Sequence, residues 1–139
     1  MNAVDTNVLV YAFDADEPVK QAKAIDLMDR LAADAANTVL IWQAIGELLN
    51  QLRKWESKGR ITTEEAEGIV HNLLSEFPVR VPSVALVGIS FDLRRRFSLS
   101  HWDSMLLAAC KEAGVTTLYS EDMDAGTNYD GVRIVNPFA

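Results

Sequence analysis

Short apolar runs rich in β-branched residues alternate with helical segments along the whole chain. The expected strands lie at Ala3-Val4, Thr38 to Trp42, Val79 to Val81, Val115 to Tyr119 and Val132 to Val135. Continuous apolar runs of this kind are typical of strands buried on both faces of a parallel sheet. Strands that alternate with helices are joined by right-handed crossovers. The chain therefore predicts an α/β fold with a mostly parallel central sheet.

The segments between these strands carry apolar residues at helical spacing and recognisable helix ends. The expected helices begin at Val8 and at Pro18, run from 43 to 58, and continue from Thr62 to Leu74, from Ser83 to Phe97 and from Ser100 to Ala113. Thr62 and Glu65 form a capping-box pattern, Ser83 and Ser100 are expected N-caps, and Gly59 ends the helix before it. No repeat, linker or low-complexity tract interrupts this order, so residues 1–139 are expected to form a single domain.

The composition excludes several classes of protein. With 49% hydrophobic residues in 139 positions, the chain is too apolar to be disordered. Its single cysteine, Cys110, cannot support a disulfide framework and is expected in the core. No apolar run reaches the roughly 18 residues of a membrane-spanning helix. The apolar start, Met1 to Phe13, lacks the basic region and cleavage site of a signal peptide, so a cytoplasmic protein is expected.

Four acidic residues stand apart from the rest. The chain carries 13 Lys and Arg against 20 Asp and Glu, a net charge of −7 that by itself disfavours binding to nucleic acid. Most of these acids fall on polar helix faces. Asp5, however, ends the first strand and Asp122 follows the fourth, while Glu47 and Asp103 lie beside the apolar stripes of their helices. Because functional residues gather at the carboxyl ends of parallel strands, the four are expected to converge at one edge of the sheet.

Each of the four acids also has a structural explanation. Asp5 and Asp122 are of a residue type that favours helix N-caps and turns. Asp103 follows Ser100 at capping-box spacing, and Glu47 lies at the border of its stripe, where it reaches water. Taken together the four favour a shared site, because unrelated acids need not all fall at one end of the sheet.

Converging carboxylates need compensation for their mutual repulsion. At an effective dielectric constant near 20, two charges about 4 Å apart repel by about 4 kcal/mol. Either some of them take up a proton or a divalent cation neutralises them. No cysteine or histidine is placed to join them, which disfavours zinc, whereas oxygen ligands suit Mg²⁺ or Mn²⁺. Such an ion takes phosphate as a further ligand and activates water, so a phosphodiester is the natural substrate.

The four acids and their neighbours resemble the PIN-domain nucleases, in particular the VapC-type toxins of type II toxin–antitoxin modules. The resemblance rests on four ordered segments and on a similar chain ending: Asp5-Thr6-Asn7-Val8, Glu47-Leu48-Leu49, the Asp103 helix, Ser120-Glu121-Asp122, and the run from Val132 to Phe138. It covers essentially the whole chain and implies a three-layer α/β/α fold.

The resemblance also implies a metal-dependent endoribonuclease that hydrolyses RNA phosphodiester bonds. The catalytic and metal-binding acids would be those at four positions: Asp5, Glu47, Asp103 and Asp122. The ion would be Mg²⁺ or Mn²⁺, and Thr6, Asn7 and Ser120 would orient the acids through hydrogen bonds. Glu121 and Asp124 leave open which residue is the fourth acid. A homodimer and a cognate antitoxin are the implied protein partners.

Affinity for RNA requires basic residues that contact phosphate. Two clusters adjoin the expected site in sequence: Arg53, Lys54, Lys58 and Arg60 in the first, and Arg94, Arg95 and Arg96 in the second. The alternative is that both complement helix C-termini, or that the second pairs with a protein partner. Trp42 and Trp102 are expected to pack partly in the core, with stacking on bases as the alternative. Trp55, with Leu48 and Leu52, is a candidate for an apolar groove that holds a partner helix.

Other interpretations of the same acids fit less well. A phosphorelay receiver needs a Lys near its last strand, and no Lys follows Lys111. A haloacid-dehalogenase-like phosphatase needs Asp-x-Asp after its first strand, where Asn7 takes the second place. A structure-specific DNA nuclease needs more acids and a larger arch than 139 residues allow. The remaining alternative is a catalytically inactive PIN-fold module that acts through a protein partner.

Overall fold

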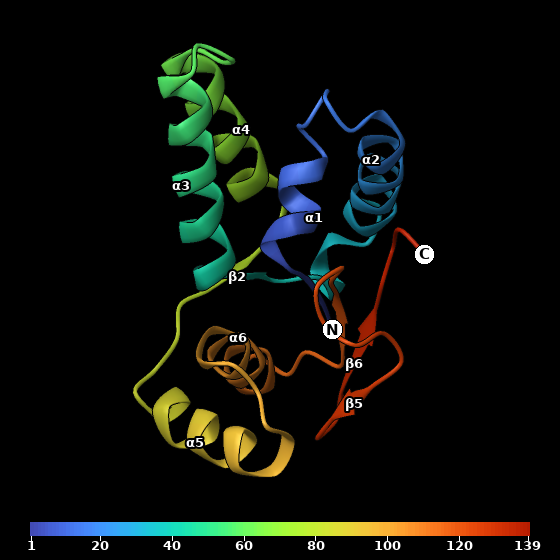
Figure 1. Cartoon of the computed structure of the whole chain (residues 1–139), viewed down its shortest axis with the longest axis vertical. Coiled ribbons are helices and arrows are strands. Elements are labelled where there is room, and N and C mark those ends of the chain that lie inside the picture. The colour runs from blue at the N-terminus through green and yellow to red at the C-terminus, as the bar shows by residue number, and fades with distance from the viewer.

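Short strands form the centre of the molecule in the computed structural model, which describes all 139 residues (Figure 1). The strands are β1 (Asn2–Val4), β2 (Leu40–Ile41), β3 (Val79–Arg80), β4 (Thr117–Tyr119), β5 (Asn128–Tyr129) and β6 (Val132–Val135). One sheet has the order β1-β4-β6-β5, in which only β5 runs antiparallel. β2 and β3 form a parallel pair that meets the first sheet through a bridge between Asn2 and Thr38. The expected α/β fold with a mostly parallel sheet is confirmed.

Helices cover both faces of the strands. They are α1 (Thr6–Tyr11), α2 (Pro18–Ala32), α3 (Trp42–Ser57), α4 (Thr63–Glu76), α5 (Ala85–Phe97) and α6 (His101–Glu112), with a short 3₁₀ turn at Ala35–Asn37. Figure 1 shows α1 to α4 on one side of the strands and α5 and α6 on the other. This is the three-layer α/β/α arrangement that the sequence resemblance implies.

Most helix ends follow the sequence signals. The Thr62 hydroxyl accepts a hydrogen bond from the Glu65 N–H at 3.0 Å, and the Glu65 carboxylate accepts one from the Thr62 N–H at 3.2 Å, which confirms the capping box. Gly59 follows α3 with a φ of +71°, a conformation that glycine adopts without strain. The Ser83 cap is wrong by one residue. The N-cap of α5 is Val84, and the Ser83 N–H donates to the Glu112 carboxylate of α6 at 2.8 Å.

Two strands differ from expectation. The run from Thr38 to Trp42 forms a strand only at Leu40–Ile41, because Trp42 already begins α3 and Thr38 makes only the bridge to Asn2. β5 is too short to show a periodic pattern, so the sequence does not predict it. It leads into a turn in which Asp130 and Gly131 have φ of 53° and 100°, and β6 returns beside it.

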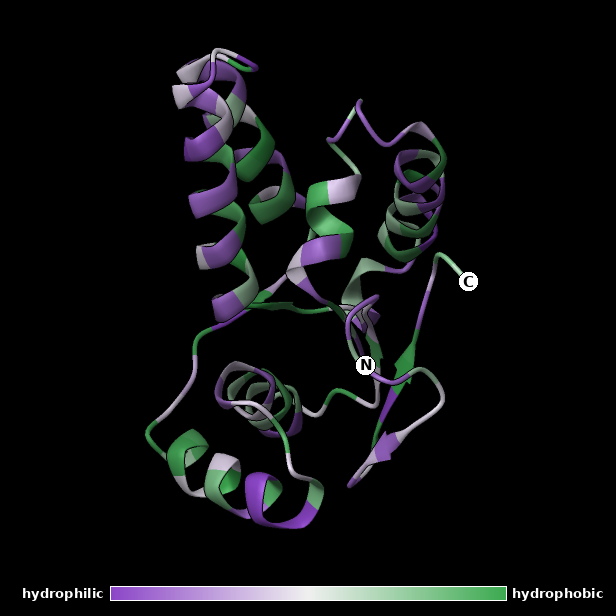
Figure 2. Cartoon of the chain, viewed as in Figure 1, coloured by the Kyte–Doolittle hydropathy of each residue, from purple (hydrophilic) through white to green (hydrophobic).

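Two hydrophobic cores lie on opposite faces of the strands. One packs β4 and β6 against α5 and α6, and the other packs β2 against α1 to α4. Figure 2 shows β2 as hydrophobic and the outer side of α3 as hydrophilic. Cys110 is fully buried, as expected, and burial raises the pKa of its thiol far above the ordinary value. Trp55 is only 3% exposed, so the prediction that it lines a partner groove is wrong.

No helix combines the length and the apolar character that crossing a membrane requires.

Candidate functional site

The centre of the site lies where β1 and β4 end side by side. Val4 is the register partner of Tyr119, so the next residues, Asp5 and Ser120, leave the sheet together. The Asp5 N–H donates to the Tyr119 carbonyl at 2.8 Å, which continues the ladder by one bond. The Ser120 hydroxyl, which is fully buried, donates to Asp5 Oδ2 at 2.8 Å. Two neighbouring strand ends therefore fix one carboxylate.

Asp5 is also the N-cap of α1. Its backbone is extended, and its Oδ1 accepts a hydrogen bond from the Thr6 N–H at 2.7 Å. The structural explanation for this residue is thus correct, and it does not compete with the functional one. Capping holds one carboxylate oxygen and Ser120 holds the other, so the side chain is fixed from two directions.

Glu47 reaches the same region from α3, which packs against α1. The Thr6 hydroxyl donates to Glu47 Oε2 at 2.9 Å, and the Gln43 amide donates to Glu47 Oε1 at 2.9 Å. Glu47 is exposed, as its place at the border of the apolar stripe predicts. Thr6 links it to Asp5, because its N–H binds one acid and its hydroxyl the other.

Asp122 approaches from the loop after β4. The Asn7 amide donates to Asp122 Oδ2 at 2.9 Å, and the Asn7 side-chain oxygen accepts from the Glu121 N–H at 3.4 Å. The Glu121 carboxylate turns elsewhere and pairs with Lys20 at 3.0 Å. Asp124 makes neither an ion pair nor a side-chain hydrogen bond. Of the three acids in this segment, only Asp122 has a carboxylate that is hydrogen-bonded to a residue next to Asp5.

Asp103 occupies the first turn of α6. Its N–H donates to the Ser100 hydroxyl at 3.2 Å, but its carboxylate does not return to the Ser100 N–H, so only half of a capping box forms. The half-buried carboxylate accepts no hydrogen bond within the chain. Its link to the other acids is indirect, since the Gln43 amide that binds Glu47 also donates to the Trp102 carbonyl at 3.3 Å.

The charges at this site are uncompensated. Burial raises the pKa of Asp5, the hydrogen bonds from Ser120 and Thr6 act in the opposite direction, and the nearby carboxylates of Glu47 and Asp122 raise it further. No Lys or Arg forms an ion pair with the four acids predicted from the sequence, although seven ion pairs occur elsewhere in the chain. The arrangement concentrates negative charge where the strands end.

The residues present fit a hard divalent cation. All available donors are oxygens of carboxylates, a hydroxyl and an amide, which suits Mg²⁺ or Mn²⁺. No three acidic, histidine or cysteine side chains come together as a closed metal-binding group. Such a group is not required, because Mg²⁺ keeps several waters and takes one or two carboxylates directly. The structure thus fits an ion held partly through water rather than one enclosed by four carboxylates.

Some of the basic residues predicted to contact RNA form ion pairs within the chain, and others do not. Arg96 pairs with Asp92 and Asp130, and Arg60 pairs with Asp14 and Asp16 while it lies over the Trp55 ring. These two have structural partners. The others in the two predicted clusters form no ion pair and remain open to solvent: Arg53, Lys54, Lys58, Arg94 and Arg95.

Two tryptophans are exposed where core packing is expected. Trp42 is 52% exposed and Trp102 is 63% exposed, so that prediction is wrong. Trp102 lines an open cleft of about 530 Å³ together with Gln43, Gly46, Glu47 and Asn50 of α3. The sequence analysis missed Gln43, although its position four residues before Glu47 places both on one helix face.

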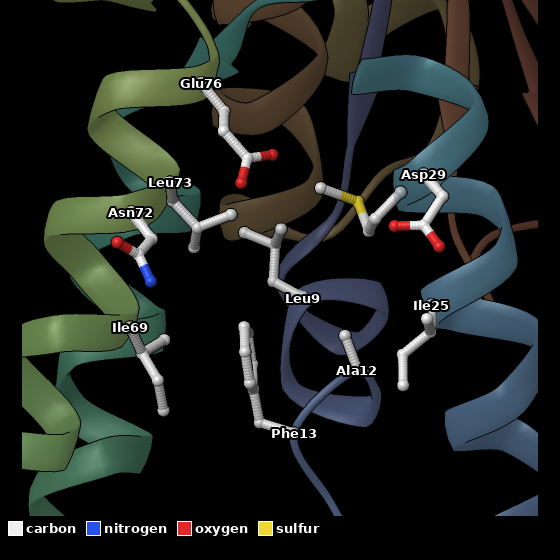
Figure 3. A pocket seen from close by; sticks show the side chains of 10 residues that line it. Leu9, Ala12, Phe13, Ile25, Asp29, Ile69, Asn72, Leu73 and Glu76 are labelled. Atoms are coloured by element: carbon white, nitrogen blue, oxygen red, sulfur yellow. The ribbon is translucent and has the colours of Figure 1, made fainter. Parts of the chain in front are cut away.

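A second, apolar hollow of about 270 Å³ lies between α1, α2 and α4 (Figure 3). Figure 3 shows Leu9 between Ile69 and Leu73 on one side and Ile25 on the other. Its other lining residues are Ala12, Phe13, Met28, Asp29, Asn72 and Glu76. None of the four predicted acids lines it, so it is separate from the charged site.

Comparisons with known proteins give one family match. The family model described as PIN domain matches residues 3–127. A comparison with curated proteins gives no match.

Three solved structures share the fold across most of their length. A toxin-antitoxin complex from Klebsiella pneumoniae has a TM-score of 0.70 at 18% identity, over 99% of this chain and 98% of that one. VapC20 from Mycobacterium tuberculosis, a Sarcin-Ricin loop cleaving toxin, has a TM-score of 0.64 at 18% identity, over 89% and 92%. VapBC2 from Rickettsia felis, bound to a DNA fragment from its promoter, has a TM-score of 0.68 at 13% identity, over 96% of each chain.

Proposed function

Because the chain belongs to the PIN-domain family of nucleases, we propose that it is a metal-dependent endoribonuclease and the toxin of a type II toxin–antitoxin module. The observation that carries the proposal is the position of Asp5, which is fixed by Ser120 and Thr6 and lies close enough to Glu47 and Asp122 for their charges to raise its pKa. A protein that used these acids only for folding would gain by pairing them with Lys or Arg. The similarity to a toxin that cleaves the Sarcin-Ricin loop supports RNA as the substrate.

We assign the metal ligands to Asp5, Glu47, Asp103 and Asp122, directly or through water. A bound Mg²⁺ or Mn²⁺ supplies Lewis acidity at a phosphate oxygen and a water of lowered pKa. The chain's own residues hold the acids in place for that ion: Ser120 fixes Asp5, Thr6 and Gln43 fix Glu47, and Asn7 fixes Asp122. Asp103 keeps both carboxylate oxygens free of hydrogen bonds.

Binding of the RNA backbone is assigned to the basic side chains that have no acidic partner. Arg53 and Lys54 lie on the helix that carries Glu47, and Arg94 and Arg95 lie near the end of α5, just before α6. Arg96 is given a structural role, because Asp92 and Asp130 already neutralise it.

An antitoxin and a second copy of the chain are the proposed protein partners. Two of the structural neighbours are a toxin-antitoxin complex and a VapBC pair. The apolar hollow between α1, α2 and α4 offers a place for apolar side chains of the antitoxin. The net charge of −7 suits a basic antitoxin segment, and the proposed location is the cytoplasm.

The test combines metal binding and RNA cleavage. Wild type, Asp5→Asn and Asp103→Asn are purified in the same way, since the Asn variants lose a charge while nearly keeping shape. We expect wild type to bind Mn²⁺ by calorimetry and to cleave RNA only with the metal, and both variants to lose cleavage.

Cleavage by Asp5→Asn at the wild-type rate would refute the assignment of Asp5. Wild type that binds Mn²⁺ and a co-purifying small protein, yet cleaves no RNA, would favour the inactive binding module.

A further inference from the structure

Trp102 is a large aromatic side chain that the fold holds in the open. It is 63% exposed, although burial of its ring would be favourable. The ring is supported rather than loose, because His101 packs edge-on against it with centroids 4.5 Å apart. Its backbone is also fixed, since the Trp102 carbonyl accepts a hydrogen bond from Gln43 at 3.3 Å. The structure therefore presents a flat apolar surface to solvent in a defined position.

The cleft beside this ring has the features of a small-ligand site. Glu47 lines it, so the cleft opens directly next to the charged centre. The space beside Gly46 is open, since a Cβ at this position would meet no atom within 4 Å. Asn50 lines the opposite part of the same helix face, and its amide forms no hydrogen bond within the chain. A flat stacking surface and a free donor–acceptor group thus face one cavity of about 530 Å³.

We propose that this cleft binds one unpaired nucleobase of the RNA, next to the phosphodiester that is cleaved, with Trp102 stacking on the base and the Asn50 amide contacting its edge. This inference rests on the proposed endoribonuclease function and names the form of RNA that the site takes. Aromatic side chains stack on bases that are free of a helix, and an amide carries both a donor and an acceptor for a base edge. A base in a duplex is already stacked on both faces and cannot enter.

The test measures RNA binding without metal, so that no cleavage occurs. Fluorescence anisotropy in EDTA compares a short single-stranded RNA with a duplex of the same sequence. The variants are Trp102→Ala, Trp102→Phe and Asn50→Ala. Phe91→Ala is the matched control, because Phe91 is an exposed aromatic of α5 that does not line the cleft. Circular dichroism and Mn²⁺ binding verify that each variant keeps its fold and its charged site.

We expect Trp102→Ala to weaken single-strand binding about tenfold, in line with the loss of one base–aromatic stack. Trp102→Phe should retain most of the affinity, and Asn50→Ala should change the order of preference among the four bases. Phe91→Ala should bind the single strand as tightly as wild type, and Trp102→Ala should not change binding to the duplex. Equal affinity of wild type and Trp102→Ala for the single strand would overturn the inference, as would a wild type that does not bind single-stranded RNA.

The outcomes separate the two proposals. A wild type that cleaves RNA, with a Trp102→Ala variant that binds and cleaves equally well, refutes the base cleft and leaves the nuclease proposal standing. A wild type that binds single strands through Trp102 but cleaves none with Mn²⁺ refutes the nuclease proposal and supports the cleft.

Discussion

Replacing Ser120 with alanine tests how the centre of the charged site is held. The Ser120 hydroxyl is fully buried and donates to Asp5 Oδ2 at 2.8 Å, so Ser120→Ala removes one donor and leaves the Thr6 N–H as the remaining partner of the carboxylate. Hydrogen bonds to charged groups contribute about 1.5–3 kcal/mol. Asp5 is only half-buried, which favours the lower end, about 1.5 kcal/mol, or a fall of roughly 5 °C in Tm.

The sign of the pH dependence follows from the same contact. The Ser120 hydrogen bond favours the ionised form of Asp5 and lowers its pKa, against the effect of burial. The stabilisation is therefore present above the pKa of Asp5 and is lost as the pH falls through it. Urea unfolding of wild type and Ser120→Ala should differ most near neutral pH and least in acid.

A double-mutant cycle isolates the contact. In an Asp5→Asn background the acceptor carries no charge, so Ser120→Ala should cost clearly less. Ser90→Ala is the matched control, since Ser90 is also buried but donates to the Val87 carbonyl at 2.7 Å. An equal cost of Ser120→Ala in both backgrounds, or the same pH dependence for Ser90→Ala, would refute the reasoning.

Three further predictions concern the stability of the fold. Arg96 and Lys111 hold the pKa of Asp130 well below its ordinary value, so the stability that the ionised carboxylate contributes is lost in acid. Asparagine also adopts the left-handed backbone of this turn. In urea unfolding, Asp130→Asn should therefore lose less stability than wild type as the pH falls below about 4. Leu118 is fully buried in β4, and Leu118→Ala should cost about 2–5 kcal/mol by urea denaturation; a smaller loss would show that the sheet closes around the gap. Thr62→Ala removes the capping box of α4 and should cost about 1 kcal/mol by the same measurement, whereas no change would mean that packing alone fixes this helix end.

The sequence predicts the parts of the structure that depend on local pattern. The apolar runs fix the strand positions to within a few residues, and Thr62 with Glu65 predicts a helix start that the structure confirms. Asp5 and Ser120 are brought together by a general property of parallel sheets, in which strand ends meet at one edge. A polar residue directly follows each strand, Asp5 after β1 and Ser120 after β4, in agreement with the observed register of Val4 with Tyr119.

The exposure of individual side chains is harder to predict from the sequence. Trp102 is a large aromatic residue of the kind expected in a core. Its ring faces solvent because of how α6 packs against α5. Arg96 pairs with Asp92 four positions earlier on the same helix, but its second partner, Asp130, lies 34 positions later in the chain. Both outcomes depend on contacts between residues distant in the sequence, which no periodicity records.

The pairing of β1 with β4 also determines when, during synthesis and folding, Asp5 and Ser120 can come together. Asn2 pairs with Thr117, and β4 lies between β1 and β6, so the sheet closes only after residues near 135 are available. Contacts this distant in sequence slow folding, because a long loop must close before they form. During synthesis, α1 to α4 leave the ribosome while Asp5 still lacks Ser120 as a partner. A nascent chain thus carries its acids in separate segments, and the charged site cannot assemble before the segment that holds Ser120 and Asp122 has left the ribosome.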